Sequence, residues 1–302
     1  MQYQILSFFQ KIESDGLMWI ANMLSMLGEE AFMIAILLVV YYIWDKKAGF
    51  SVFSSLICAQ LVTNVIKAIV RFPRPFTLYP ELGSSRLETA TGYSFPSGHT
   101  TGAAAFYPAL ARESGRLSAL VLAILLAVLI GLSRNILRVH WPVDVVVGLF
   151  IGLAFSLAAG RILDRIYQDR SIRLRFCSAA CLLSFFPALI LTVLLSAGLA
   201  DKVAFSDLMK LLALSSGAYA GCVIETRYAC FRVQRRAVKA LASLVTAMGV
   251  VILIMLSKAI IPQSLYYPGS ALRYLLIGLW TTGLFPLLGV RTGLLERESS
   301  DT

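Results

Sequence analysis

Residues 94–99 read Ser-Phe-Pro-Ser-Gly-His, and small and apolar residues follow this hexapeptide as far as Arg112. The pattern predicts that a helix begins near Ser97, where Ser97 and Gly98 can direct backbone N–H groups toward a bound anion. His99 can accept or donate a proton near neutral pH. The stretch therefore suits a phosphate site at a helix end. A serine that only caps the helix, beside a histidine without a chemical role, is the alternative.

The composition around this hexapeptide is that of a membrane protein. Of the 302 residues, 58% are hydrophobic and 15% are charged, whereas soluble domains are about 45–50% apolar. Uncharged runs of membrane-spanning length recur along the chain, and the alternating segments typical of a membrane β-barrel do not. We therefore expect an all-α fold, a polytopic transmembrane helical bundle.

Nine membrane spans are expected in this bundle. They cover approximately residues 31–44, 48–70, 97–112, 117–133, 143–162, 176–200, 204–225, 238–260 and 272–290. Residues 1–28 mix apolar and polar side chains, which predicts an amphipathic segment at the membrane interface. The chain then divides into that segment, a core at 29–166 that contains the hexapeptide, and a C-terminal transmembrane extension at 176–302.

Basic residues set the expected orientation of the chain. We attribute the net charge of +10 to the cytoplasmic excess of Lys and Arg in membrane proteins, and not to nucleic-acid binding. These residues concentrate at alternate helix ends, above all in an expected loop at 161–175. The positive-inside rule then places the N-terminus outside, the C-terminus inside, and both histidines, His99 and His140, on the outer side. We expect an integral protein of a bacterial inner membrane with its site facing the periplasm or outside. An endoplasmic-reticulum protein with a lumenal site is the alternative.

The second histidine, His140, lies among residues that could serve the same chemistry. Arg134 ends the predicted fourth helix beside Ser133, His140 follows six residues later, and Asp144 lies four residues after His140. Since residues i and i+4 share a face near a helix start, Asp144 can hold one ring nitrogen of His140 and leave the other free to act. Asp144 could also be a simple helix-start acid.

Lys67 and Arg74 lie at the end of the predicted second helix, on the same outer side. Pro73 and Pro75 flank Arg74 and fix the backbone around it. A guanidinium group can bind phosphate oxygens through two parallel hydrogen bonds. Taken alone, Lys67 could be an anchor that extends its ammonium group to the membrane surface, but the four helix ends together predict one site.

Three motifs combine these residues: Lys-x6-Arg-Pro at 67–75, Pro-Ser-Gly-His at 96–99 and Ser-Arg-x5-His-x3-Asp at 133–144. In this order and spacing they resemble the signature of the phosphatidic acid phosphatase type 2 superfamily, which includes lipid phosphatases, glucose-6-phosphatase and the vanadium haloperoxidases. The resemblance covers residues 67–144 and, with the flanking helices, about 30–165. The nine-span layout is similar to the glucose-6-phosphatase and sphingosine-phosphate phosphatase branch.

This resemblance implies a role for each motif residue. His140 would attack phosphorus and form a phosphohistidine, Asp144 would orient His140, and His99 would protonate the leaving oxygen. Phosphoryl oxygens would be bound by Lys67, Arg74, Ser97, Gly98 and Arg134. No metal and no cofactor are implied.

The implied activity is that of a metal-independent phosphatase, a phosphoric monoester or lipid diphosphate hydrolase acting at the outer membrane face. Its substrate would be a phospholipid, or an isoprenoid or sphingoid phosphate. One alternative is a phosphotransferase that passes the phosphoryl group to a lipid or sugar acceptor. A second is a non-catalytic transporter of anionic lipids.

The C-terminal extension at 176–302 has no motif of this kind. Gly217 and Gly221 form a Gly-x-x-x-Gly pattern, which predicts close helix packing. The extension could bind lipid, form a homodimer through its helices or shape a lateral entrance, and the sequence does not choose among these. The five cysteines lie mostly in apolar runs, which is against a disulfide framework.

Three further features lie near the motifs. The loop at 76–95, which includes Glu81 and Glu88, is expected to cover the site. Arg71 and Arg138 are extra basic residues within the motifs. We expect both arginines to face lipid phosphates, and a wider anion site is the alternative.

Overall fold

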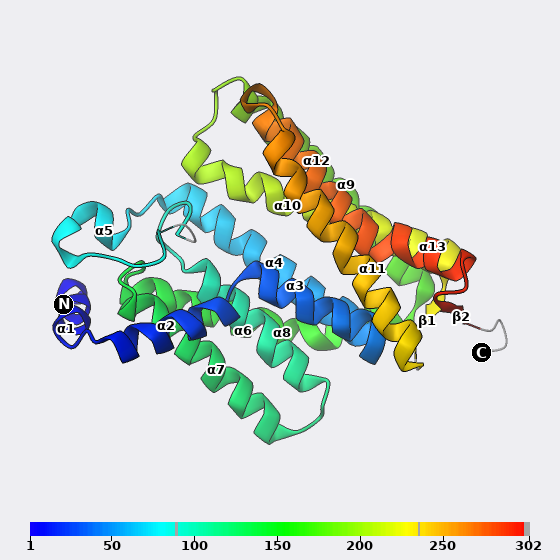
Figure 1. Cartoon of the computed structure of the whole chain (residues 1–302), viewed down its shortest axis with the longest axis horizontal. Coiled ribbons are helices and arrows are strands. Elements are labelled where there is room, and N and C mark those ends of the chain that lie inside the picture. Colours follow the sequence, from blue (N-terminus) through cyan, green and yellow to red (C-terminus); the bar gives the residue numbers. More distant parts are fainter. Residues whose placement is uncertain (88–89, 235, 299–302) are drawn as a thin grey trace. The chain divides into compact units, whose positions relative to one another are not determined.

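The computed structural model describes residues 1–87, 90–234 and 236–298, and these are predominantly helical (Figure 1). This confirms the all-α prediction. The chain forms two compact units. The N-terminal unit consists of Met1–Ile34 and Ser51–Ile162, and the C-terminal unit consists of Ala35–Phe50 and Leu163–Thr302.

The N-terminal unit contains nine elements among its described residues. In chain order these are α1 (Gln2–Lys11), α2 (Asp15–Leu27), the start of α3 (Glu30–Val39), most of α4 (Lys46–Val70), α5 (Pro75–Leu78), the 3-10 helix η2 (Pro80–Leu82), α6 (Gly98–Arg112), α7 (Leu117–Ile136) and most of α8 (Pro142–Gln168). Two serines begin helices here. Ser14 accepts a hydrogen bond from Leu17 N at the start of α2, and Ser97 accepts one from Thr100 N at the start of α6, as expected of N-cap residues.

The C-terminal unit holds the remaining helices and one small sheet. After the end of α3 and the start of α4, its elements are η1 (Val40–Trp44), α9 (Arg170–Ser196), α10 (Lys202–Ile224), η4 (Glu225–Ala229), β1 (Phe231–Arg232), α11 (Ala237–Leu256), η5 (Ser257–Ile260), η6 (Gln263–Leu265), α12 (Tyr266–Leu279), η7 (Trp280–Leu284), α13 (Phe285–Arg291) and β2 (Glu296–Arg297). The strands β1 and β2 pair antiparallel, with Phe231 opposite Arg297.

The expected basic loop at 161–175 is wrong. Helix α8 continues to Gln168 and α9 already begins at Arg170. Asp169, between them, accepts hydrogen bonds from Ser171 N at 2.8 Å and Ile172 N at 3.0 Å. This N-cap satisfies free N–H groups at the start of α9, and the arginines that follow therefore lie on a helix.

The close packing predicted from Gly217 and Gly221 is confirmed. Both glycines lie on α10, which packs against α12 and η7. A Cβ atom on Gly217 would lie 1.9 Å from the carbonyl oxygen of Leu275, and one on Gly221 would lie 2.1 Å from Thr282 Oγ1. Only residues without a side chain permit this approach.

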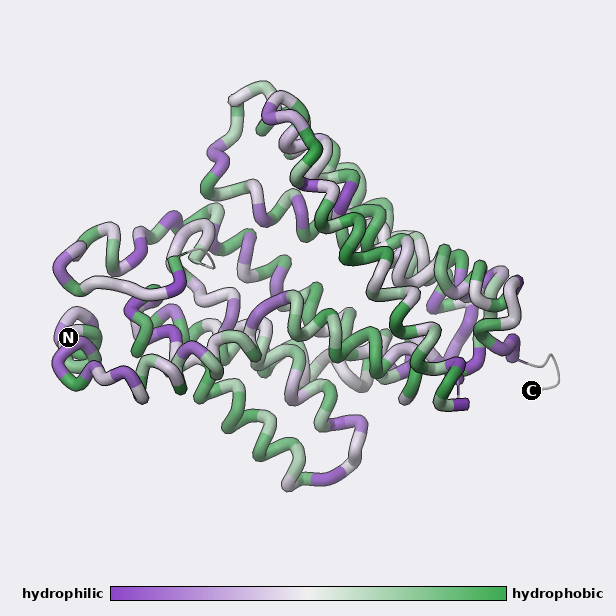
Figure 2. Tube along the Cα trace, viewed as in Figure 1, coloured by the Kyte–Doolittle hydropathy of each residue, from purple (hydrophilic) through white to green (hydrophobic). Residues whose placement is uncertain are grey.

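Six helices of the described chain are long and apolar enough to cross a membrane, or up to eight if each of two bent helix pairs is one span. Figure 2 shows hydrophobic residues along the helices and hydrophilic residues gathered mainly in turns and at helix ends. The predicted count of nine is not confirmed. The additional predicted span corresponds to α6, whose 15 residues extend about 22 Å, less than a hydrocarbon core of about 30 Å.

Helix α6 is the centre of the N-terminal unit because small residues let its neighbours approach closely. A buried cluster joins it to α7 through Ala103, Ala104, Ala127 and Ile130. On α8, a Cβ atom at Gly152 would lie 2.5 Å from Ala104 Cβ. This packing brings the starts of α6 and α8 together, where Ser97 N donates to Asp144 O at 3.0 Å.

Candidate active site

The buried ring of His140 lies in the short segment between α7 and α8. Its Nδ1 is 3.2 Å from Asp144 Oδ2, and its Nε2 is 3.2 Å from Arg74 Nη1. A neutral ring protonated on Nδ1 donates to the Asp144 carboxylate and keeps a lone pair on Nε2. That lone pair faces the guanidinium group of Arg74. His140 Nε2 is therefore the ring atom directed toward the basic cluster, which consists of Lys67, Arg74 and Arg134.

Asp144 is held by three donors that converge on a single oxygen. Ser94 Oγ donates to Oδ2 at 2.5 Å, Trp141 N donates at 2.8 Å, and His140 Nδ1 is the third. The side chain is fully buried, and its Oδ1 has no hydrogen-bond partner among the residues described. The carboxylate is therefore fixed in place and can fix the His140 ring in turn.

Arg74 links the histidine to the loop that precedes the hexapeptide. Its guanidinium donates to the carbonyl oxygens of Gly92 at 2.9 Å, Thr91 at 2.5 Å and Val139 at 2.9 Å. Arg74 is 5% exposed. Its fork is thereby oriented before any ligand binds, which is what a phosphate-binding arginine requires.

Lys67, at the end of α4, adds a second positive charge. Its Nζ donates to Tyr93 O at 2.6 Å. The pKa of His140 is held well below its ordinary value of 6.5, first by burial and then by the positive charges of Arg74, Lys67 and Arg134. These charges therefore lie close enough to act on the ring, and they keep it in the neutral form that a nucleophile needs.

The Ser-Gly-His part of the hexapeptide forms the start of α6. Ser97 is buried and its Oγ accepts from Thr100 Oγ1 at 2.9 Å, while the carbonyl oxygen of Gly98 accepts from Gln60 Nε2 at 3.0 Å. His99 Nε2 is buried and has no hydrogen-bond partner among the residues described. A buried ring nitrogen of this kind is available to a ligand.

Arg134 is fully buried at the end of α7, and α2 supplies a partner for it. Arg134 Nη1 donates to Ser25 Oγ at 2.5 Å, and Ser25 is itself 0% exposed. The pKa of His99 is also held well below its ordinary value of 6.5, first by burial and then by the positive charges of Arg134 and Arg74. The structure thus places Arg134 among the other predicted site residues.

The N-terminal helices are attached to the site through several polar contacts. Gln2 Oε1 accepts from Val143 N at 3.2 Å, at the start of α8. Glu13 forms an ion pair with Arg138 at 3.0 Å, and Arg138 is 4% exposed. The expectation that Arg138 faces lipid phosphates is therefore wrong, because its guanidinium is buried against the connection between α1 and α2 and against the loop, where its Nε also donates to Gly83 O.

The loop at 76–95 is tied to the same helices. Arg86 donates to Asn22 O at 3.3 Å and forms an ion pair with Glu29. Gln10 Nε2 donates to Glu81 O at 2.8 Å. Arg71 is exposed and its Nε donates to Ala68 O at 2.9 Å. Glu88 lies outside the described residues.

Two family models match this chain. A model of the PAP2 superfamily covers residues 48–168, and a model of the PAP2 superfamily phosphatase transmembrane extension covers residues 209–298. The chain belongs to the PAP2 superfamily. PAP2 abbreviates the phosphatidic acid phosphatase type 2 name, so the resemblance drawn from the three motifs is confirmed. With its apolar helices and its transmembrane extension, this PAP2 chain is an integral membrane protein.

Two curated PAP2 relatives are similar over part of their length. Lipid A 1-phosphatase of Rhizobium johnstonii is 31% identical over 125 residues, which are 39% of this chain and 48% of that protein. Decaprenylphosphoryl-5-phosphoribose phosphatase of Mycobacterium tuberculosis is 32% identical over 112 residues, which are 37% of this chain and 57% of that protein. The chain spans about half the length of the curated relatives it matches.

Two solved structures are also similar. One is a transmembrane PAP2 type phosphatidylglycerolphosphate phosphatase from Bacillus subtilis, with a TM-score of 0.47 and 24% identity over 55% of this chain and 85% of that chain. The other is LpxE of Aquifex aeolicus, with a TM-score of 0.45 and 21% identity over 52% of this chain and 92% of that chain.

The PAP2 match contains all eight predicted site residues, but not every residue that contacts them. Ser25 lies before residue 48, whereas Ser94 lies inside the match as the first residue of the hexapeptide at 94–99. Sequence reasoning gave neither serine a role, because a lone serine in a helix or loop has no distinguishing pattern. Asn135 was also missed, and its Nδ2 donates to His140 O at 3.0 Å. Its place directly after Arg134, inside a motif, was the one available signal.

Proposed function

We propose that this PAP2 protein is a metal-independent phosphatase that hydrolyses a lipid phosphate or lipid diphosphate through a phosphohistidine on His140. One observation carries the proposal. The buried His140 ring has its Nδ1 at 3.2 Å from Asp144 and its Nε2 directed at Arg74. Asp144 orients the imidazole ring, and the free ring nitrogen lies beside a guanidinium group that can bind phosphate. This is the arrangement needed for in-line attack of the ring nitrogen on phosphorus.

The first step forms the bond between His140 Nε2 and phosphorus. The negative charge of the bound phosphate favours the protonated form of His99. The Nε2 lone pair attacks, the bond from phosphorus to the leaving oxygen breaks, and His99 donates its proton to that oxygen, which belongs to the lipid alcohol of a monophosphate or to the remaining phosphate of a diphosphate. The phosphorylated His140 ring carries positive charge, which the Asp144 carboxylate offsets through Nδ1–H. Arg74 must exchange its contact with Nε2 for a phosphoryl oxygen as the substrate enters.

The second step returns the enzyme to its starting state. A water molecule gives a proton to the now neutral His99 and attacks phosphorus, the bond from Nε2 to phosphorus breaks, and inorganic phosphate leaves. His140 is neutral again and His99 is protonated for the next cycle. His99 thus gives one proton to the leaving oxygen and regains one from water, while His140 carries the phosphoryl group between the two steps.

The basic residues stabilise the charge on the phosphoryl oxygens during both steps. We assign this role to Lys67, Arg74, Ser97, the Gly98 N–H and Arg134. Donors that are already oriented in a buried site act without the reorganisation that water would need, and removing a single such donor typically costs about 10²–10³ in kcat. The burial and fixed contacts of Arg74 and Arg134 support this assignment.

The names of the two curated relatives support a lipid-linked substrate. A hydrocarbon-anchored phosphate would also suit a site built at the ends of membrane helices.

We further propose that the chain divides into an interfacial segment at 1–28, a catalytic core at 29–166 and a C-terminal extension at 176–302. The distribution of Lys and Arg supports a site on the outer face of a bacterial inner membrane.

Phosphate release by detergent-purified protein tests the proposal. Lipid monophosphates and diphosphates are assayed with EDTA present, and the His140→Ala variant is measured alongside. We expect release by the wild type only, and an acid-labile phosphoryl group on His140 after a brief reaction. Equal release by His140→Ala would contradict the mechanism. Transfer to an added lipid or sugar acceptor without free phosphate would instead identify a phosphotransferase.

A further inference from the structure

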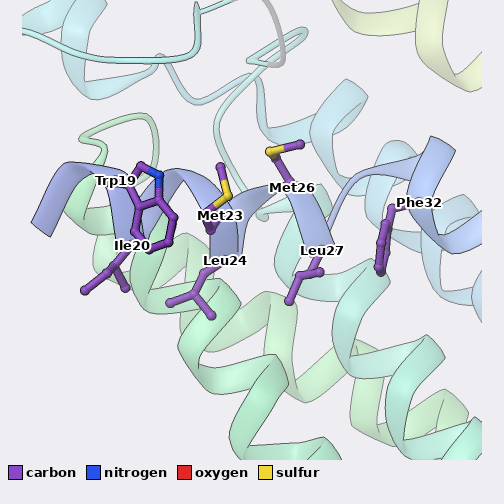
Figure 3. A pocket seen from close by; sticks show the side chains of 7 residues that line it. All are labelled: Trp19, Ile20, Met23, Leu24, Met26, Leu27 and Phe32. Atoms are coloured by element: carbon purple, nitrogen blue, oxygen red, sulfur yellow. The ribbon is translucent and has the colours of Figure 1, made fainter. Parts of the chain in front are cut away.

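An apolar groove lies along α2 and the start of α3 in the N-terminal unit (Figure 3). Its volume is about 370 Å³, and it is open along its outer side. In Figure 3, Ile20, Leu24 and Leu27 extend from one side of α2, as their spacing of four and three residues requires. Trp19, Met23 and Phe32 also line it, and Phe32 comes from α3. Several of these large side chains are exposed, with Ile20 52% and Phe32 41% accessible.

The other side of α2 faces the candidate active site. Ser25, between two groove residues in sequence, is fully buried and accepts from Arg134 Nη1. Gly28 follows Leu27 directly, and a Cβ atom on Gly28 would lie 3.4 Å from His99 Cβ. One helix therefore separates the groove from the basic cluster.

The groove reaches the site at the bend between α2 and α3. The two helices meet at an angle of 51° across Gly28 and Glu29. Leu27 and Phe32, which both line the groove, flank this bend on either side. Because Gly28 touches His99 at the same bend, the groove ends beside the histidine that would protonate the leaving lipid oxygen.

We propose that this groove binds the hydrocarbon chain of the lipid whose phosphate is bound at His140, an inference that rests on the proposed function. The phosphate would lie on the Ser25 side of α2, and the chain would pass the bend at Gly28 and continue along Leu24 and Ile20. From Gly28 back to Trp19 the helical rise is about 13 Å, long enough to hold the part of a lipid chain nearest the phosphate. The exposed outer side of the groove lets the chain enter from the bilayer without leaving an apolar environment.

Photocrosslinking tests the position of the chain without requiring turnover. The probe is a long-chain lipid phosphate with a diazirine in the middle of its chain, bound to the His140→Ala variant in nanodiscs. We expect label on residues 19–32. Unlabelled lipid phosphate should displace the probe, and the same lipid without its phosphate should not. Label confined to other helices would overturn the proposal. Equal displacement by the dephosphorylated lipid would also overturn it, because the groove would then hold bulk membrane lipid.

Chain-length discrimination tests the groove in the active protein. We compare a long-chain lipid phosphate with a short-chain, water-soluble ester and fill the groove by Ile20→Trp or Met23→Trp. The ratio of kcat/KM, long over short, should fall by about tenfold, which corresponds to about 1.4 kcal/mol. The matched control is Leu122→Trp, at a 65% exposed position on α7 outside the groove.

The two experiments separate failure of the groove from failure of the proposed function. An unchanged ratio in both groove variants, with normal turnover of both substrates, would overturn the groove and leave the phosphatase intact. No phosphate release from any substrate would overturn the phosphatase. The crosslinking result would then still decide whether an anionic lipid places its chain on α2.

Discussion

Replacing Asp144 by asparagine removes one charge and little else from the candidate site. Three donors converge on Oδ2, including His140 Nδ1 at 3.2 Å. The asparagine oxygen must therefore take the place of Oδ2, and its NH2 group takes the place of Oδ1, which has no partner among the described residues. The side chain keeps its shape and its acceptor. The variant thus isolates the electrostatic contribution of the carboxylate to the phosphohistidine step.

The expected magnitude follows from the distance and the surroundings. Two unit charges about 4 Å apart interact by about 4 kcal/mol at an effective dielectric constant of about 20. Part of this is retained because a neutral hydrogen bond contributes about 0.5–1.5 kcal/mol. We therefore expect Asp144→Asn to raise the barrier by about 2–4 kcal/mol, which lowers kcat by about 30-fold to 1,000-fold. KM should change little, because Asp144 does not contact the phosphoryl oxygens in the proposed mechanism.

The assay is the rate of phosphate release in detergent, with thermal unfolding measured on the same samples. The matched control is Asp207→Asn on α10, whose carboxylate pairs with Lys210 at 3.0 Å in the C-terminal unit. This control should keep wild-type kcat. If folded Asp144→Asn protein retains more than one third of wild-type kcat, the carboxylate does not stabilise a charged His140 ring and the reasoning is refuted.

Three further predictions concern the pKa of a histidine, a contact and a packing site. Burial and nearby cations hold the pKa of His140 well below 6.5, so kcat/KM measured against pH should stay constant to below pH 6.5. Lys67→Met removes one of these cations and should therefore shift the loss of kcat/KM at acid pH to a higher pH. The unfolded ring takes up a proton below about pH 6.5 that the folded ring does not, so the stability against urea should fall as the pH drops through that value. Ser25→Ala should lower kcat/KM about tenfold or more, since hydrogen bonds to charged groups contribute about 1.5–3 kcal/mol; unchanged kinetics would exclude a positioning role. Gly217→Val should lower the melting temperature by several degrees, whereas Gly249→Val, which has open space around it, should not; equal shifts would argue against close packing as the cause.

The sequence predicted some contacts of the candidate site and not others, for a physical reason. His140 and Asp144 are four residues apart at a helix start, so local geometry alone places their side chains close together. Arg134 and Ser25 are 109 residues apart, and their contact depends on how α2 packs against α7. A buried serine on an apolar helix face has no local pattern, which is why α2 was predicted only as an interfacial segment.

The number of membrane spans also depends on packing that the sequence pattern does not reveal. Hydropathy measures whether a segment can lie in lipid, but α6 is surrounded by protein, and nine of its residues are buried. Its small residues, such as Ala103 and Ala104, pack against α7 and α8. A short helix of this kind is buried among its neighbours along most of its length. Apolar composition therefore predicted a span at α6 without indicating how short and how buried this helix is.

The four residues before the Phe-Pro-Ser-Gly-His sequence explain how so many charges are held in a buried site. The backbone carbonyls of Thr91 and Gly92 accept from Arg74, and that of Tyr93 accepts from Lys67. The next residue, Ser94, donates to the Asp144 carboxylate. Carbonyl dipoles thus offset the positive charges before substrate arrives and keep the basic side chains oriented for an entering phosphate. Because a carbonyl is present in every residue, this arrangement leaves no trace in side-chain identity, and a loop that the sequence predicts only as a cover organises the charges of the site.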